Sequence, residues 1–413
     1  MKSIKHWINP KNLKLTLISV GVSVTIWGCE KIAPSAPLPD EIMSSPLEGL
    51  TYAQNRLFNE GAEEFDEIYT TATGLGPYYV ANSCASCHGG DNRGHLFTNL
   101  TRFGQTDSTG NHFTSMGGPQ LQHRTLAGHI PETLPAGATS SQFIAPIVAG
   151  VGFLELVPDA DILAMAQANA NNPDGVKGRP NWCNLPSYVN PSPNAISKNG
   201  KYIAKFGRKA AAYNLLQQTA QAFNQDMGIT TTCMPNEPYN PFDLAHNPIP
   251  KNPDISNQSL FATVFYLQVL QTPPRRNSGD PQVLLGEQLF KSIGCETCHK
   301  QTLKTGTSEI PALSLKEFHP YTDLLLHDMG PELDDGYTEG IAKTSEWKTT
   351  PLWGLGLANT AQGRQLYLLH DGRARSIEEA IEYHNGESTS SKNKFNALSA
   401  AEKSQLLAFL NSL

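Results

Sequence analysis

Cys84-Ala85-Ser86-Cys87-His88 and Cys295-Glu296-Thr297-Cys298-His299 are two copies of one motif, Cys-x-x-Cys-His, in a chain of 413 residues. This spacing is the attachment signature of a c-type haem. Two thiols one helical turn apart can bond to the vinyl groups of the porphyrin, and the adjacent histidine is held against the iron. We therefore expect two covalently bound haems with His88 and His299 as proximal ligands.

Two other chemistries use part of this pattern. A thioredoxin-like redox pair has Cys-x-x-Cys but does not need the histidine that follows, and it would not be expected twice. A zinc site built from both motifs is possible on spacing alone. The two histidines and the export signal described next argue against zinc.

The first 28 residues are expected to be a lipoprotein signal peptide. Four lysines precede an uncharged, mostly apolar run, Leu15 to Gly28, which is too short for a comfortable membrane span. Gly28 then precedes Cys29, as at a bacterial lipoprotein cleavage site. We expect a lipid on Cys29, a proline-rich tether over residues 29–50, and a periplasmic protein held at the outer membrane by that lipid alone. Plain secretion and an uncleaved anchor are the alternatives.

The composition is that of a globular chain. Hydrophobic residues make up 39% and aromatic residues 8%, enough for a core, and the length suggests two to three domains. Removal of residues 1–28, with four lysines and no acids, leaves 27 basic and 38 acidic residues. No basic run with interleaved aromatic residues suggests nucleic-acid binding. Two further cysteines, Cys183 and Cys233, either form a disulfide in an oxidising compartment or stay free and buried.

Helical patterns flank both motifs, and they predict a mainly α fold of two cytochrome c-like domains. Residues 285–293 have helical spacing and lead into the second motif, and a capping box at Ser399 and Glu402 starts a closing helix. Residues 57–69 and 260–270 are the corresponding helices of the first domain. Prolines and polar residues after Leu270 place the boundary, giving domains 51–275 and 276–413. The first domain carries a long insertion, residues 89–257, of the kind that usually has a function.

The stretch Leu369-His370-Asp371-Gly372-Arg373-Ala374-Arg375-Ser376-Ile377-Glu378-Glu379-Ala380-Ile381 resembles a signature of bacterial di-haem cytochrome c peroxidases and their MauG relatives. The chain is more closely similar to the di-haem oxidoreductase family. Further segments match that family in order over about residues 50–413: Gly74-Leu-Gly-Pro77, Lys205-Phe-Gly-Arg-Lys209, Asp226-Met-Gly-Ile-Thr230, Leu325-Leu-His-Asp-Met-Gly330 and Pro351-Leu-Trp-Gly354.

A helix that starts at Ile377 would place His384 on its buried face, because Ile377, Ala380 and His384 follow helical spacing. From the pattern alone, His384 is either a core histidine or an iron ligand. The resemblance favours the ligand, because the peroxidases have a methionine at the matching position as sixth ligand of the second haem. A second histidine there would lower the reduction potential. Met329 and His327 are the alternative ligands.

The distal side of the first haem is left open by the sequence. His95, His112, Met116 and His123 all follow the first motif and could reach the iron. The resemblance instead implies an open face with a catalytic glutamate over it, and Glu155, among apolar residues, matches that position. Burial would raise its pKa and suit it to proton transfer. A helix-start acid or a salt-bridge partner is the alternative for Glu155. Gln120 is a weaker candidate for the same pocket.

The resemblance implies an enzyme that reduces hydrogen peroxide. Electrons from a small electron-donor protein or a quinol-linked donor would enter at the second haem and reach the first, with Trp347 or Trp353 as a bridge. A calcium ion between the domains is also implied, without assigned ligands. The alternatives are a non-catalytic electron-transfer cytochrome, in which His95, His112 or His123 ligates the first haem, and a MauG-like oxidase of a partner protein.

Overall fold

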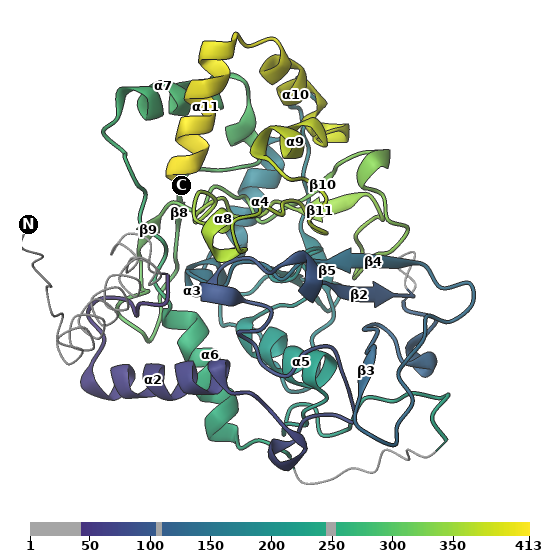
Figure 1. The fold of residues 1–413 in the computed structure, drawn as a ribbon. Helices are drawn as coiled ribbons and strands as arrows, with labels where there is room; N and C mark the ends of the chain where they lie inside the picture. The colour runs from purple at the N-terminus through teal and green to yellow at the C-terminus, as the bar shows by residue number, and fades with distance from the viewer. Residues whose placement is uncertain (1–42, 105–109, 245–252) are drawn as a thin grey trace, which may run out of the picture. The chain divides into compact units, whose positions relative to one another are not determined.

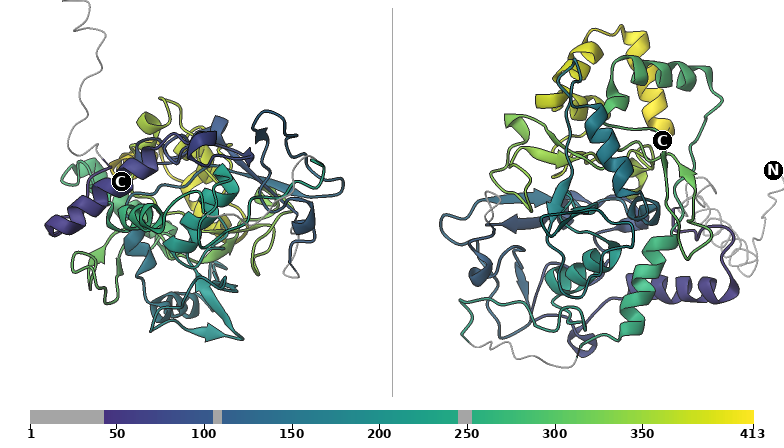
Figure 2. Two further views of the ribbon diagram at one scale, coloured as in Figure 1. Left: turned by 90° about the horizontal axis from the view of Figure 1, so that it is seen from below. Right: turned by 180° about the vertical axis from the view of Figure 1, so that it is seen from behind.

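The structure, a computed structural model, describes residues 43–104, 110–244 and 253–413. Two pairs of crossed helices are its main helical elements. Ile42–Leu413 forms one compact unit, in which one helix pair lies at the opposite end from the other (Figures 1 and 2). The expected signal peptide, Cys29 and most of the tether lie outside the described residues. The domain boundary expected near residue 275 stays a prediction.

The described residues contain ten α-helices and several single turns of 3₁₀ helix. The α-helices are α2 (Tyr52–Asp66), α3 (Val151–Glu155), α4 (Asp159–Ala168), α5 (Leu215–Met227), α6 (Asn257–Val269), α7 (Pro281–Ser292), α8 (Ala358–Ala361), α9 (Ile377–Glu382), α10 (Thr389–Asn396) and α11 (Ala400–Ser412). The 3₁₀ turns are η2 (Thr71–Thr73), η3 (Gly89–Asp91), η4 (Leu96–Thr98), η5 (Thr114–Met116), η6 (Cys295–Thr297), η7 (Pro331–Leu333) and η8 (Gly386–Ser388).

Five small antiparallel sheets join distant segments: β1–β3, β2–β4, β5–β7–β6, β8–β9 and β10–β11. The strands are β1 (Tyr78–Tyr79), β2 (Leu100–Phe103), β3 (Arg124–Thr125), β4 (Ser140–Phe143), β5 (Asn181–Cys183), β6 (Ser197–Lys198), β7 (Lys201–Ala204), β8 (Leu303–Lys304), β9 (Glu317–Phe318), β10 (Leu326–Asp328) and β11 (Glu346–Lys348). The expectation of a mainly α fold is therefore corrected to a mixed one, with helices over 33% of the described residues. The physical reason is the long proline- and glycine-rich connections, which pair as short strands instead of forming helices.

The first helix pair is α2 and α6, which cross at Gly61. A Cβ atom on Gly61 would lie 2.1 Å from the backbone oxygen of Ala262, so the two helices meet backbone to backbone. Phe58 and Phe65 of α2 pack on Tyr266 of α6, with ring centres 5.0 and 5.3 Å apart. Burial of these aromatic faces stabilises the crossing.

The second pair, α7 and α11, repeats this geometry. A Cβ atom on Gly286 would lie 2.0 Å from the backbone oxygen of Gln405. Phe290, four residues after Gly286, packs on Phe409, four residues after Gln405, with ring centres 5.2 Å apart. The expected packing of these two helices, and the expected capping box of Ser399 and Glu402, are both confirmed.

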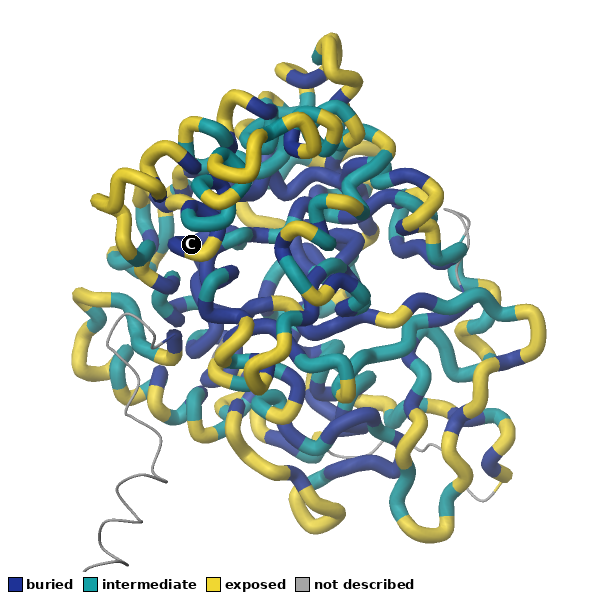
Figure 3. The backbone as a smooth tube through the Cα atoms, turned by 45° about the horizontal axis from the view of Figure 1, so that its top comes forward, coloured by how far each residue is buried: buried dark blue, intermediate teal, exposed yellow. Residues whose placement is uncertain are grey.

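The buried residues form several clusters between these pairs, and the exposed ones follow the outer turns (Figure 3). Cys183 and Cys233 are both free thiols, so the expected disulfide is corrected; the alternative of free, buried thiols holds for Cys183, whereas Cys233 is half-buried. Cys183 is buried in β5, where its Sγ contacts the carbonyl oxygen of Ala210 at 3.7 Å. Among the described residues, no helix has the length and apolarity that a membrane span requires.

We predict that Gly286→Ala destabilises the protein by about 1–3 kcal/mol, although alanine is the better helix former, because the methyl group meets the backbone of α11. The free energy of unfolding in denaturant measures this. Gly279→Ala is the matched control, since nothing lies within 4 Å of its added Cβ atom. An equal effect of both substitutions would contradict the close contact.

Candidate functional site

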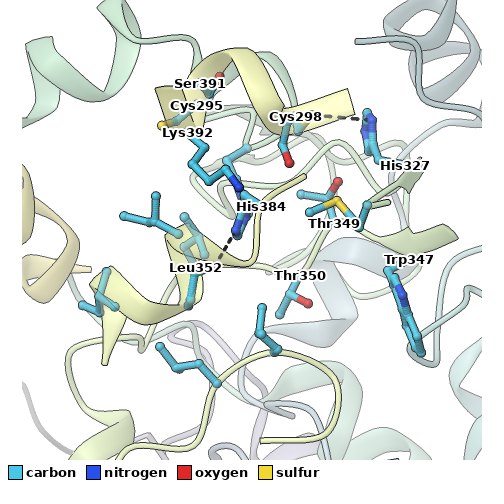
Figure 4. A pocket seen from close by; sticks show the side chains of 18 of the residues that line it. Cys295, Cys298, His327, Trp347, Thr349, Thr350, Leu352, His384, Ser391 and Lys392 are labelled. Carbon is cyan, nitrogen blue, oxygen red and sulfur yellow. Dashed lines mark hydrogen bonds between the residues drawn. The ribbon is translucent and has the colours of Figure 1, made fainter. Parts of the chain in front are cut away.

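A cavity lies next to the second Cys-x-x-Cys-His motif. Its volume is about 210 Å³, and its lining includes Cys295, Cys298, His299 and His384. We call it the second-motif cavity. His384 lies at the centre of the labelled side chains in Figure 4, and Trp347 lies at one side. Leucine, isoleucine and phenylalanine side chains form a large part of the remaining lining, which suits a large apolar ring.

His299 follows η6 and is oriented by a backbone carbonyl. Its Nδ1 donates to the oxygen of Tyr321 at 2.9 Å, and its ring packs near Phe290 of α7 with centres 6.4 Å apart. Burial lowers the pKa of His299 to about 4, so the ring is neutral at pH 7. A neutral imidazole with its Nδ1 occupied has Nε2 left as a metal-binding atom.

His384 has the same kind of partner. We expected His384 to lie on helix α9. The helix ends at Glu382, so His384 lies two residues beyond its end. Its Nδ1 nevertheless donates to the oxygen of Ala380 at 2.7 Å, which turns the side chain back along α9. Burial lowers its pKa, so this imidazole also favours the neutral form. Ser376 caps α9 by accepting from the backbone nitrogen of Glu379, and the Glu379 carboxylate accepts from the backbone of Arg375.

The spacing of these two rings fits one iron ion. Their centres lie 6.5 Å apart. A metal–imidazole bond is about 2.0 Å and a ring nitrogen lies about 1.1 Å from the ring centre, so two rings on opposite sides of one metal have centres roughly 6.2 Å apart. With the two cysteines on the same cavity, the residues present fit a haem.

His327 contacts the second motif but has no free ring nitrogen. Its Nε2 lies 2.9 Å from an oxygen of Asp323, and its Nδ1 lies 2.7 Å from Glu387 and 3.6 Å from the Sγ of Cys298. Figure 4 shows the contact with Cys298. Burial acts to lower the pKa of His327, but Asp323 and the other partners raise it well above its usual value. This arrangement holds a buried imidazolium between two carboxylates and argues against His327 as an iron ligand.

Trp347 lies in a stack on the wall of the cavity. Its ring is 3.6 Å from that of His370 at an angle of 10°, and the Nζ of Lys209 is 3.6 Å from its centre. His370 Nε2 donates to Asp335 at 2.6 Å, while Lys209 donates to backbone carbonyls. The His-Asp-Gly match pointed to His370, but no sequence signal indicated the stack with Trp347 and Lys209. Trp353 is buried elsewhere in the core, where its ring is 6.1 Å from Phe318.

The first motif has a similar proximal side. His88 Nδ1 donates to the oxygen of Pro146 at 2.9 Å, and its ring centre lies 6.0 Å from that of Phe65 in α2. Burial lowers the pKa of His88 to about 4. Cys87 is buried and Cys84 is half-buried, and burial raises the thiol pKa of Cys84 to about 12 and that of Cys87 to about 11.

The residues expected on the distal side of the first haem differ in their exposure and in their hydrogen-bond partners. His112 and His123 are exposed, and Met116 is half-buried. His95 accepts a hydrogen bond from the backbone of Phe97 through Nδ1, so it caps η4. Gln120 is buried and contacts Arg102 at 3.4 Å, while its Nε2 has no hydrogen-bond partner in the described structure.

Glu155 ends α3 and is held by two helices. One oxygen accepts from the backbone of Leu215 at the start of α5, and the other accepts from Gln268 of α6, both at 2.8 Å. Burial raises its pKa, while these hydrogen bonds and Lys205 act to lower it. The contacts give Glu155 a structural role, and its catalytic role stays a prediction.

The geometry agrees with what comparisons with known proteins found. Residues 140–413 match a family model described as "Di-haem oxidoreductase, putative peroxidase". The chain belongs to the di-haem oxidoreductase family. Members of this family carry haem, which is the group that the second-motif cavity fits.

Among solved structures, this di-haem oxidoreductase is similar to a chain of Kuenenia stuttgartiensis hydrazine synthase pressurized with xenon. The two share 14% identity over 92% of this chain and 95% of that chain, with a TM-score of 0.38. None of the curated proteins matches the chain.

We predict that His327→Gln destabilises the protein by about 3–5 kcal/mol near pH 6, because it leaves the buried Asp323 and the half-buried Glu387 without their cation. The folded pKa of His327 is raised, so its stabilisation is fully present below about pH 6.5 and is lost as the pH rises through the folded pKa. Unfolding in denaturant from pH 5.5 to 9 should show the difference shrinking as the pH rises.

His319→Gln is the control for this prediction, because His319 is exposed and its Nδ1 contacts only Thr302 at 3.0 Å. This substitution should change the free energy of unfolding by no more than about 0.5 kcal/mol. A pH-independent loss in the His327 variant would mean that packing, and not the charge of the imidazolium, is what the substitution removes.

Proposed function

We propose that this di-haem oxidoreductase is a periplasmic c-type enzyme that reduces hydrogen peroxide. The observation that carries the proposal is the pair of neutral imidazoles, His299 and His384, at the spacing of two ligands of one iron. A haem ligated on both sides has no site for peroxide and suits electron transfer. The substrate would then react at the first motif, where His88 is the proximal ligand.

Covalent attachment is supported by the position of the four thiols. Cys295 and Cys298 line the same cavity as the two imidazoles, and Cys84 and Cys87 precede a histidine with the same kind of carbonyl partner. The lipid on Cys29 and the location at the outer membrane belong to the proposal on the strength of the signal sequence alone.

The chain's own residues set the conditions for this reaction. Bound haem supplies the redox chemistry, both the storage of electrons and the cleavage of peroxide. Carbonyls of Tyr321, Ala380 and Pro146 orient the axial histidines, and the apolar lining excludes water. Trp347 is the better bridge candidate of the two tryptophans, because it lines the cavity.

The donor is a small electron-donor protein or a quinol-linked one. A calcium ion stays a prediction: in the described chain the residues grouped at metal-binding distance are Cys298, Asp323 and His327, which lack the six to eight oxygens that calcium takes. A non-catalytic cytochrome would need a second ligand for the first haem, and the exposure of His112 and His123 speaks against them. Oxidation of a partner protein would instead give turnover only with that partner.

The test is an EPR spectrum of the purified holoprotein, oxidised and half-reduced, together with peroxide consumption by a reduced donor. We expect one low-spin haem and one that is high-spin or becomes so on half-reduction. His384→Ala should convert the low-spin centre to high-spin, because it removes a ligand. Two haems that stay low-spin throughout in the unaltered protein would leave only the electron-carrier function.

Glu155→Gln tests the predicted catalytic acid. Loss of a general acid should lower peroxide turnover about 100-fold and leave the haem spectra unchanged. The substitution keeps the shape of the side chain and, through its Oε1, the hydrogen bond from Leu215. Normal turnover with lowered thermal stability would assign Glu155 to helix packing alone.

A further inference from the structure

Four lysine and arginine side chains line the second-motif cavity. Lys392 donates to Glu382 and Asn385 close to it in the chain, and the other three are Arg93, Arg208 and Lys348. They come from distant parts of the chain. Arg93 follows the first motif by five residues, Arg208 belongs to the insertion, and Lys348 lies in β11. The backbone of Lys348 donates to the oxygen of Arg208 at 3.0 Å, so at least these two segments are joined directly.

The contacts of the two arginines leave most of their donors unused. Arg93 donates to the oxygen of Pro351 at 2.8 Å, and its Nε has no partner. Arg208 donates from Nε and one terminal nitrogen to the single oxygen of Ile144, at 3.0 and 2.7 Å. Their exposed fractions are only 6% and 7%. Within the described ranges, neither arginine nor Lys348 forms an ion pair with a carboxylate.

Other cations of the described chain differ: the half-buried Arg102 and Arg179 each have an acid, whereas the buried Lys209 donates to backbone carbonyls. Arg102 lies 2.8 Å from Glu339, and Arg179 lies 2.5 Å from Glu346. A buried charge without such a partner is costly. An anion among Arg93, Arg208 and Lys348 would therefore be stabilising, and no carboxylate of the described residues pairs with any of the three.

The protonation behaviour points the same way. Burial lowers the pKa of Arg93 to about 10. The pKa of Arg208 is lowered to about 9 by burial and by the charge of Arg93, whereas Asp371 has a weaker effect that raises it. Burial and the charge of Arg208 lower the pKa of Lys348 to about 7. The charge of Arg93 disfavours the protonated form of Arg208, and the charge of Arg208 disfavours that of Lys348. A negative group among the three would offset this repulsion.

We propose that Arg93, Arg208 and Lys348 bind the propionate carboxylates of the haem attached to Cys295 and Cys298. The inference rests on the proposed function, since it needs a haem in this cavity. A guanidinium group matches a carboxylate with two parallel hydrogen bonds, and the ammonium of Lys348 adds a point charge. The two propionates of one haem would supply the missing anion.

The same charges raise the reduction potential of that haem. Reduction adds an electron, and nearby cations favour the more negative state. The cluster would thus offset part of the lowering that a second axial histidine causes. Because Arg93 belongs to the loop after the first motif, the potential of the second haem would depend on that loop.

The experiment is a spectroelectrochemical titration of the purified holoprotein, followed by visible absorption and EPR. Arg208→Gln should lower the reduced-to-oxidised ratio of the second haem about tenfold at a fixed potential, which is about 59 mV for a one-electron couple. Arg208→Lys keeps the charge and should recover most of this shift. His384→Met identifies which of the two transitions belongs to the second haem.

Two variants guard against a simple folding defect. Lys348→Met provides the same test if Arg208→Gln does not fold. The reduced-to-oxidised ratio of the second haem at a fixed potential should be lower in this variant as well. Arg179→Gln is the control, because Arg179 has its own carboxylate and does not line the cavity. It should lower stability and leave both potentials unchanged.

The outcomes separate this inference from the proposed function. Covalent haem is first counted after denaturation, and fewer than two per chain would contradict the proposed function itself. With two haems present, unchanged potentials in both Arg208→Gln and Lys348→Met would overturn the propionate assignment. A potential that responds to added phosphate at constant ionic strength in the unaltered protein, but not in Arg208→Gln, would assign the cluster to a free anion and also overturn it.

Discussion

Contact between helix backbones at two glycines is the constraint on which both haem motifs depend. Gly61 and Gly286 let α2 and α7 approach α6 and α11 without an intervening side chain. Four residues further along each helix, Phe65 and Phe290 lie near the histidine of the adjacent motif. A larger residue at either crossing would separate the helices and displace an aromatic ring from its histidine.

The partner of each histidine decides its chemistry. His88, His299 and His384 each donate one hydrogen bond to a backbone carbonyl, which is neutral and leaves the other ring nitrogen available. His327 lies close by but contacts a carboxylate on each side, so it carries a charge and cannot ligate. These four imidazoles thus divide into three ligand candidates, which are half-buried, and one structural cation, which is buried.

Local signals allowed part of this arrangement to be predicted from the sequence. The two motifs, the cap at Ser399 and the position of His384 depend on residues close together in the chain, and hydrogen bonds within a turn or two preserve their spacing. The sheets were not predictable, because strands as short as β10 and β11 have little propensity of their own and depend on long-range pairing.

The charged parts of the site were hidden for the same reason. The partners of His327 are Asp323, four residues before it, and Glu387, sixty residues after it, and only the fold shows that both reach one ring. The cations at the cavity likewise come from three separate segments. No periodicity or motif links Arg93 to Lys348, since their proximity depends on how the insertion packs.

Glu387 also accepts hydrogen bonds from the backbone nitrogens of Lys177 and Gly178, at 2.9 and 3.0 Å. Gly178 has a φ of +64°, and a Cβ atom there would lie 2.6 Å from the ring of His327. The insertion is therefore part of the wall behind the second motif, even though it precedes that motif by more than a hundred residues. The C-terminal half of the protein is consequently not an independent module. If it were fused to another cytochrome, its haem site would lack the wall that the insertion provides.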